Sequence, residues 1–288
     1  MHTFHHTGDL GDIIASLPVI RALGGGRLVI SDAKFPLGHG PRESVRGARF
    51  EALRHITGAA PYVSEIVWED NPQGVTHDIA SFRSLTWQVA ETLAQWQGRY
   101  FRLALPAAPA PWLHIAEPVM HNKIVVAHTH RYNTTYFPWR LLVDKYWEDM
   151  VFLGLRNEYI DFVSCAKKDI QWVKTSNLLQ ATEYIAGSRL FIGGQSVLFW
   201  IAAGLGHPLI QETHDKIYTR NSVIPRDNAL YTDCNTSLER LYDMMKLDKL
   251  WFATHKIPNA TVNLSSSAGQ PRRNLSTSAE IYEQLKVQ

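Results

Sequence analysis

The sequence lacks the features that mark secreted and membrane proteins. Its 288 residues include only two cysteines, Cys165 and Cys234, which are too few for a framework of disulfides and are typical of a reducing compartment. No apolar run approaches the ~18 residues of a membrane span, and Met1 to His6 lacks the charged and apolar regions of a signal peptide. We therefore expect a cytoplasmic protein with no transmembrane segment.

Excess charge and the signatures of nucleophilic catalysis are also lacking. Lys and Arg number 29 and Asp and Glu 27, which leaves a formal net charge of +2 and disfavours a protein that coats nucleic acid. The chain has no G-x-S-x-G elbow, Walker motif, H-E-x-x-H or CxxC, which disfavours covalent hydrolase and metalloprotease chemistry. An apolar share of 45% and a charged share of 19% indicate a globular chain with a substantial core.

Short apolar runs alternate with helical patterns, as in proteins built on parallel sheets. We predict strands at 1–6, 27–31, 65–68, 123–128, 150–154, 190–194 and 207–211, and helices at 13–23, 50–56, 86–96, 177–186, 197–205 and 236–251. Four prolines within 105–118 predict a linker. The fold class is therefore α/β, with doubly wound domains at 1–118 and 119–255 facing a cleft, and a polar tail at 256–288 with a short terminal helix.

The strongest local feature is the pair Gly193-Gly194 between a buried strand and a helix. The residues that follow, Gln195, Ser196 and Val197, place backbone N–H groups at the positive end of the helix, an arrangement that binds phosphate. Ser196 either caps the helix or donates its hydroxyl to a phosphate. A tight turn with a serine cap is the alternative, and the residues alone leave both open.

A second turn, Gly8 to Asp12, follows the first predicted strand, where open α/β sheets place ligands. Its two acids, Asp9 and Asp12, would repel a phosphate. They fit a general base or an acceptor of sugar hydroxyls instead. Capping of the helix by these acids is the alternative.

A third feature, His128 to Tyr132, follows another buried strand. The planar fork of Arg131 suits a diphosphate. His128 and His130 share one face of an extended segment, but no third ligand stands at a suitable spacing, so we expect no metal.

Further polar residues follow the strand at 207–211. Glu212 stands where Rossmann-like halves hold a ribose, with a surface glutamate as the alternative. Lys216 and Arg220 lie in a polar loop that would close over phosphates. A basic stretch at 42–54 is read as a solvated helix face, with an anionic acceptor as the alternative.

Together these segments resemble the ADP-heptose:lipopolysaccharide heptosyltransferases, glycosyltransferase family 9. Leu10 to Leu23 follows the family's Gly-Asp-x₅-Pro-x₄-Leu start, and Ala186 to Ser196 with Ile201 to Pro208 is similar to its strand, glycine turn and helix. Phe152-Leu153-Gly154 with Glu158 resembles its glycine-then-glutamate segment. The family's Asn-Asp is replaced here by Gly194-Gln195, its next glycine by Val197 and its histidine by Phe199 or Trp200.

The resemblance implies a GT-B fold, a donor nucleotide-sugar on the carboxyl-terminal domain and an acceptor on the amino-terminal one. It also implies metal-independent chemistry with inversion, with the family's proposed base mapping onto Asp12. Arg131 is similar to the arginine that meets the donor diphosphate in GT-B fucosyltransferases. We expect donor contacts from one set of residues, Gly194, Gln195, Ser196, Val197, Glu212, Lys216 and Arg220. We expect acceptor contacts from another set, Asp9, Gly11 and His128.

The function predicted from the sequence is therefore an inverting, metal-independent glycosyltransferase that needs no cofactor. It would move a sugar from a nucleotide-diphosphate donor to an acceptor hydroxyl. A sugar-nucleotide epimerase and a non-catalytic nucleotide-sugar-binding protein are the alternatives. The acceptor class stays open among a saccharide, a lipid-linked glycan, a protein and a modified nucleic-acid base.

Overall fold

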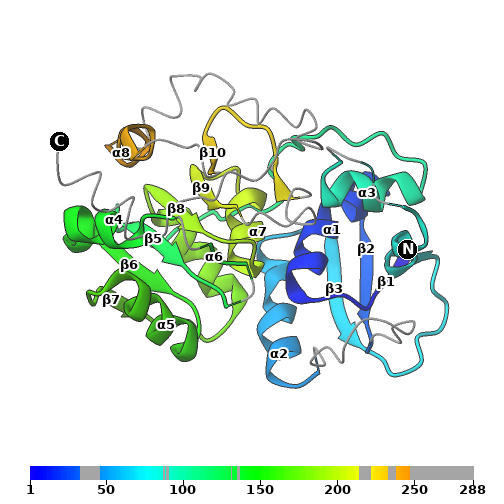
Figure 1. The fold of residues 1–288 in the computed structure, drawn as a ribbon. Coiled ribbons are helices and arrows are strands. Elements are labelled where there is room, and N and C mark those ends of the chain that lie inside the picture. The colour runs from blue at the N-terminus through cyan, green and yellow to red at the C-terminus, as the bar shows by residue number, and fades with distance from the viewer. Residues whose placement is uncertain are drawn as a thin grey trace.

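The computed structural model describes residues 1–32, 46–86, 88, 91–130, 132–134, 137–213, 222–232 and 238–246. Its strands are β1 (His2–His6), β2 (Gly26–Ile30), β3 (Val63–Trp68), β4 (His77–Asp78), β5 (Ile124–Ala127), β6 (Met150–Leu153), β7 (Gln171–Val173), β8 (Leu190–Gly193), β9 (Leu209–Glu212) and β10 (Ala229–Thr232). They form two sheets, and every pairing within them is parallel. The predicted fold class, α/β with doubly wound parallel sheets, is confirmed (Figure 1).

The helices of the described residues lie between most successive strands, although none lies between β3 and β4. They are α1 (Leu10–Ala22), α2 (Ala48–Arg54), α3 (Leu93–Tyr100), α4 (Trp139–Tyr146), α5 (Arg156–Ala166), α6 (Leu178–Gly187), α7 (Val197–Gly204) and α8 (Leu238–Lys246), with 3₁₀ turns η1 (His55–Gly58), η2 (Ile79–Ser84) and η3 (Trp147–Asp149). This alternation is what parallel sheets require, because each parallel pair needs a crossover connection.

The first sheet has the strand order β3-β2-β1-β4. Its first crossover, α1, contains Pro18 and is followed by Gly24 and Gly25, whose φ angles of 92° and 74° are disfavoured for other residues. The strand order reverses between β1 and β4, and ligands of open α/β sheets bind at such switch points. The turn that follows β1 therefore lies where a ligand is expected.

The second sheet has the strand order β10-β9-β8-β5-β6-β7, the doubly wound order of dinucleotide-binding domains. Its switch point lies between β5 and β8. Side chains of β5 alternate between the two faces: Ile124 and Val126 pack with α4, α5 and α8, whereas Val125 and Ala127 pack with α6 and α7. Burial on both faces explains why these strands read as unbroken apolar runs.

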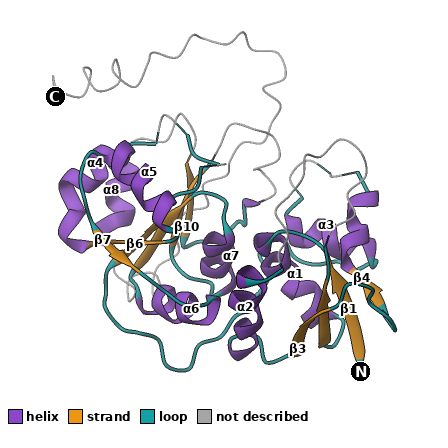
Figure 2. Ribbon diagram, turned by 90° about the horizontal axis from the view of Figure 1, so that it is seen from below, coloured by secondary structure: helices purple, strands orange, loops and turns teal. Residues whose placement is uncertain are grey.

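The two sheets share one apolar core. A single cluster of buried side chains runs from β1 and β2 through α1 and α7 to the inner face of the second sheet. Figures 1 and 2 both show α1 and α7 side by side between the sheets. The amino ends of these two helices follow the switch-point strands β1 and β8, so their packing brings both candidate ligand sites together.

Two predicted segments, the helix at 86–96 and the linker at 105–118, differ from what the sequence indicates. The helix predicted over 86–96 is wrong in its first part: α3 begins at Leu93, because Thr92 forms a capping box with Gln95. The proline-rich stretch 105–118 contains no helix or strand, as predicted, but it packs tightly. Trp112 is fully buried, and the backbone N–H groups of Trp112 and Leu113 both donate to the Gly204 carbonyl at the end of α7.

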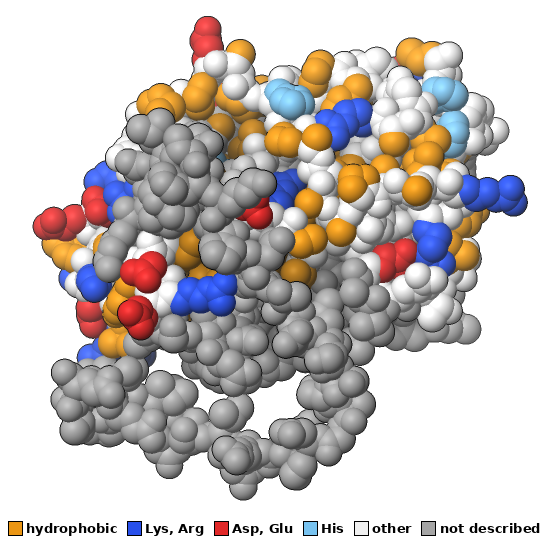
Figure 3. Space-filling model, turned by 90° about the horizontal axis from the view of Figure 1, so that it is seen from above, with side chains coloured by type: hydrophobic (Ala, Val, Ile, Leu, Met, Phe, Trp, Pro, Cys, Tyr) orange, Lys and Arg blue, Asp and Glu red, His pale blue; other side chains and the backbone are white. Residues whose placement is uncertain are grey.

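The surface of the described residues carries charges of both signs. On the face shown in Figure 3, Lys and Arg side chains stand apart from one another and alternate with apolar and acidic ones. Within the described ranges, no helix has both the length and the apolar character needed to cross a membrane.

Substituting Trp112 with alanine tests whether the proline-rich stretch is part of the core. Trp112→Ala is expected to lower the free energy of unfolding by about 3–5 kcal/mol, because it leaves a large cavity. Trp147, which is 44% exposed, provides the matched control, and Trp147→Ala should cost under about 1 kcal/mol. Equal, small losses in urea unfolding would show that 105–118 is an independent linker.

Candidate active site at two switch points

The first switch point places a carboxylate beside an arginine. Asp12 lies in the first turn of α1, and its Oδ2 is 2.6 Å from Nη2 of Arg83 in η2. Both side chains are about one quarter exposed, at 24% and 27%. Asp9 occupies the N-cap position but makes no capping bond with its side chain, so the capping alternative is wrong for that residue. Its Oδ1 instead lies 3.9 Å from Nη2 of Arg49 in α2.

A buried histidine holds the turn between β1 and α1 in place. His6, the last residue of β1, is fully buried, and its Nδ1 accepts the backbone N–H of Gly8 at 2.8 Å. A methyl group on Gly8 would lie 2.6 Å from His6 Cε1 and 2.9 Å from Asp12 Oδ2, so both side chains pack directly against this glycine. Burial, with the nearby Arg83 charge, lowers the pKa of His6 well below its ordinary value. His6 is therefore neutral, with its proton on Nε2.

Arg83 is held in place from both ends of η2. Before η2, Asp78 accepts from His5 Nδ1 at 2.8 Å and from the Ser81 hydroxyl. The His5 hydrogen bond holds the pKa of the Asp78 carboxyl below its ordinary value, and the group stays charged. After η2, the indole N–H of Trp96 donates to the Leu85 carbonyl at 3.0 Å.

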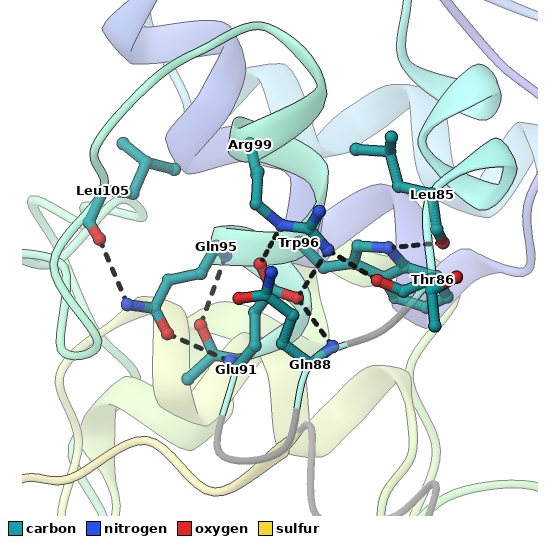
Figure 4. Close-up of polar contacts among 9 residues, drawn as sticks. Leu85, Thr86, Gln88, Glu91, Gln95, Trp96, Arg99 and Leu105 are labelled. Atoms are coloured by element: carbon teal, nitrogen blue, oxygen red, sulfur yellow. Dashed lines mark hydrogen bonds and ion pairs between the residues drawn. The ribbon is translucent and has the colours of Figure 1, made fainter.

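The segment between η2 and α3 is anchored further by Arg99. Its guanidinium donates to the Thr86 carbonyl at 2.7 Å and to both carboxylate oxygens of Glu91, at 2.7 and 3.0 Å (Figure 4). Together with the contacts of Asp78 and Leu85, this pair fixes the backbone on both sides of Arg83.

The second switch point has the geometry expected of an anion site. Gly194 and Gln195 connect β8 to α7, and Ser196 is the N-cap, its Oγ accepting the Phe199 N–H at 3.2 Å. Ser196 therefore does cap the helix, and its hydroxyl retains a proton to donate. A Cβ on Gly194 would lie 2.8 Å from the Tyr132 carbonyl, so the loop after β5 closes on this turn.

The two switch points touch. A Cβ added to Gly11 in α1 would lie 3.0 Å from Trp200 Cδ1 and 3.7 Å from the backbone nitrogen of Val197 in α7. Gly11 precedes Asp12, and Val197 follows Ser196. The carboxylate and the helix amino terminus thus border the same region of the molecule.

Glu212 lies neither in an open ribose site nor on the surface, the two environments predicted for it. Its side chain is fully buried, so the surface alternative is wrong. Oε1 accepts the Thr134 N–H at 2.6 Å and Oε2 the indole N–H of Trp139 at 3.2 Å, with His128 Nδ1 at 3.5 Å from Oε2. A direct bond to a ribose would require these bonds to break. Glu212 therefore holds the loop that follows β5.

His128 is likewise buried, at 2% exposure, between Glu212, Trp139 and Phe162. The structure places it in the second lobe beneath the β5 loop rather than beside α1. As placed, its side chain is not available to the acceptor contact predicted for it.

Glu158 offers the accessible carboxylate that Glu212 does not. It lies in the first turn of α5, just after β6, and is only partly buried. Its Oε2 accepts the Leu155 N–H at 3.0 Å and would meet a Cβ on Gly154 at 2.9 Å. Burial raises the pKa of Glu158, although the Leu155 N–H and the nearby His130 oppose this shift.

Three predicted phosphate ligands, Arg131, Lys216 and Arg220, lie outside the described residues. Of the predicted basic stretch, Arg54 of α2 pairs with Glu51 at 2.8 Å, as expected of a solvated helix face, whereas Arg46 precedes α2 and pairs with Asp70 at 3.4 Å. In the part of the chain that the structure describes, no three His, Cys, Asp or Glu side chains are placed to hold a metal ion.

Sequence reasoning missed His6 and Arg83. Arg83 stands 71 positions from Asp12, and only the pairing of β4 with β1 brings them together. His6 carried one signal, because it is the last residue of the strand that precedes the Gly8 turn.

Comparison with solved structures reveals the same architecture. Escherichia coli ADP-heptose lipopolysaccharide heptosyltransferase II superposes with a TM-score of 0.56 and 12% identity, over 85% of this chain and 98% of that one. E. coli heptosyltransferase WaaC with ADP-2-deoxy-2-fluoro heptose gives 0.53 and 11% over 85% and 99%. A family 9 glycosyltransferase from Veillonella parvula gives 0.52 and 10% over 87% and 94%. The chain has the GT-B fold of these heptosyltransferases.

At these identities the likeness is one of fold. No protein-family model matches the sequence, and no curated protein matches it either. The fold suspected from the sequence motifs is thus confirmed by structure alone.

Acidification tests the buried His6. Because its pKa is lowered in the folded state, the unfolded chain binds this proton first as the pH falls below about 6.5. Stability is therefore expected to decrease below that pH, by up to about 1.4 kcal/mol per pH unit from this group.

The variant His6→Asn keeps an acceptor for the Gly8 N–H but does not titrate. Urea unfolding of both proteins between pH 5 and 8 should show this acid-dependent loss in the wild type and less of it in the variant. Parallel curves would show that His6 is not buried as a neutral base.

Proposed function

We propose that this protein is an inverting glycosyltransferase that transfers a sugar from a nucleotide-diphosphate donor to an acceptor hydroxyl without a metal ion. The observation that carries the proposal is the contact of the two switch points at Gly11 and Val197. It supports the proposal because it brings the first turn of α1, which contains Asp12, to the amino terminus of α7 within a fold shared with heptosyltransferases. A base and an anion site are the two groups that transfer from a diphosphate donor requires.

Asp12 is proposed as the general base. The acceptor hydroxyl lies against its carboxylate and gives up its proton as the oxygen attacks the anomeric carbon. The bond from that carbon to the diphosphate oxygen breaks, and both electrons leave with the nucleoside diphosphate. Attack opposite to the leaving group inverts the anomeric centre.

The turn between β8 and α7 is proposed to stabilise the leaving diphosphate. The N–H groups of residues 195–197 and the positive end of α7 face the developing charge. The Ser196 hydroxyl, already oriented by its bond from the Phe199 N–H, donates to a phosphate oxygen. Arg131, Lys216 and Arg220 are proposed as cationic partners, so that fixed charges take the role of a metal ion.

Glu158 is proposed to accept the ribose hydroxyls in place of Glu212. In doubly wound nucleotide-binding domains an acid at the end of the second strand binds the ribose, and β6 is the second strand of this sheet. Glu212 is proposed to contribute indirectly, because its bond to the Thr134 N–H holds the backbone three positions after Arg131 in the sequence.

Asp12→Asn should separate binding from transfer. Because the amide cannot accept the proton, we expect the transfer rate to fall by at least about 100-fold. The dissociation constant for the donor should stay within about threefold, since the base acts mainly in the transition state. A thermal-shift screen of nucleotide-sugars identifies the donor first, because a ligand of the folded state raises the midpoint.

Calorimetry and a transfer assay on the same Asp12→Asn preparation then decide the role of Asp12. Equal loss of binding and transfer would mean that Asp12 is structural. NMR of the donor without acceptor separates the rival functions: an epimerase converts it alone, and a binding protein leaves it unchanged even when acceptors are present.

Glu158→Gln tests the ribose assignment. The amide oxygen still accepts the Leu155 N–H, so the α5 turn is preserved. The loss of a charged acceptor should weaken nucleoside diphosphate binding roughly 10-fold in calorimetry. Binding of inorganic diphosphate, which has no ribose, should not change. An equal effect on both ligands would place Glu158 away from the ribose.

A further inference from the structure

We propose that Arg83 is a positioning residue for Asp12, one that orients the carboxylate and keeps it charged for proton abstraction. This inference rests on the proposed function and extends it to a residue with no role in the motifs of the sequence. The distance of 2.6 Å from Nη2 to Oδ2 is that of a charge-assisted hydrogen bond. Its donor comes from η2 and its acceptor from α1, so the pair also links the two sides of the switch point.

The surroundings of Arg83 show that its position is fixed before any ligand arrives. Its guanidinium carbon lies 4.5 Å from the centre of the Phe82 ring. Phe82 is itself buried edge-on against Trp96, with ring centres 4.7 Å apart. Hydrogen bonds of Asp78 and Leu85 tie the two ends of η2 to β1 and to α3. The guanidinium of Arg83 therefore reaches Asp12 from a backbone segment that is held at both ends.

Asp12 is restrained on its other sides as well. Its backbone carbonyl accepts from Gln97 Nε2 of α3 at 3.2 Å, and its carboxylate lies against Gly8. A carboxylate held at one oxygen by a fixed cation presents its other oxygen in one orientation. Reaction at that oxygen avoids the entropy cost of orienting the base.

Several charged and titratable groups lie around Asp12. Arg83 faces it from η2, while neutral His6 lies below it in β1. Asp9, one turn earlier, is paired with Arg49 of α2, and Asp78 is paired with His5. Among the residues that the structure describes, Arg83 contacts the Asp12 carboxylate directly. Its removal should therefore make the Asp12 carboxyl easier to protonate.

The test compares Arg83→Gln with Arg27→Gln in the full chain. Arg27 is the matched control, because it lies in β2 of the first sheet, is also 27% exposed and pairs with Glu69 at 2.7 Å, close to the 2.6 Å of the Arg83 pair. We expect Arg83→Gln to lower kcat roughly 10- to 100-fold, as expected for loss of a charge-assisted hydrogen bond. The KM for the donor should not change, and Arg27→Gln should leave both constants unchanged.

Two readouts distinguish positioning from a structural role. The acid limb of the pH profile of kcat/KM should move to higher pH in Arg83→Gln, and guanidinium ion should restore part of the activity of Arg83→Ala. Unchanged kcat and an unchanged acid limb in Arg83→Gln would overturn the inference.

A measurement without turnover separates this inference from the proposed function. With aspartate labelled at the carboxyl carbon, the Asp12 signal is assigned by its loss in Asp12→Asn and followed through a pH titration. Its midpoint should rise in Arg83→Gln and stay in place in Arg27→Gln. An unmoved midpoint in Arg83→Gln overturns the inference. A midpoint that rises in Arg83→Gln, found together with a wild-type protein that transfers no sugar, overturns the proposed function alone.

Discussion

The packing of α1 against α7 is the constraint on which the candidate site depends. Each helix follows the central strand of its own sheet, so each amino terminus lies at a switch point. Contact at Gly11, where even a methyl group would press on Trp200 at 3.0 Å, brings those termini together. Because α1 and α7 belong to one apolar core, the arrangement of the lobes and the geometry of the site are set by the same packing.

Both lobes use a buried polar side chain to shape the loop above it. In the first, His6 Nδ1 accepts the Gly8 N–H, and in the second, Glu212 Oε1 accepts the Thr134 N–H. Both are last residues of strands, and both are removed from solvent. A buried hydrogen bond is costly to break, because both of its groups would be left unpaired away from water, so each bond holds its loop in one conformation. The backbone at Gly8 and at Thr134 is therefore held in place.

The sequence was informative where local pattern decides structure. Strands such as β1 and β8, the helices after them and the Ser196 cap follow from apolar periodicity and turn chemistry. Asp12 is predicted as a site residue because it stands in a local motif, Gly8 to Asp12. The pairing of Asp12 with Arg83 depends on strand order, which local pattern does not encode. The burial of Glu212 likewise depends on Trp139 and Thr134, more than 70 residues earlier.

The central claim is that the carboxylate of one lobe and the anion site of the other act on a single ligand. A crystal structure with a bound nucleotide-sugar tests it most directly, through two distances. The account predicts the diphosphate within hydrogen-bonding distance of the N–H groups of residues 195–197. It also predicts that the anomeric carbon faces the Asp12 carboxylate, with space between them for the acceptor hydroxyl group. A donor bound with its anomeric carbon turned away from Asp12, or a diphosphate held elsewhere, would contradict it.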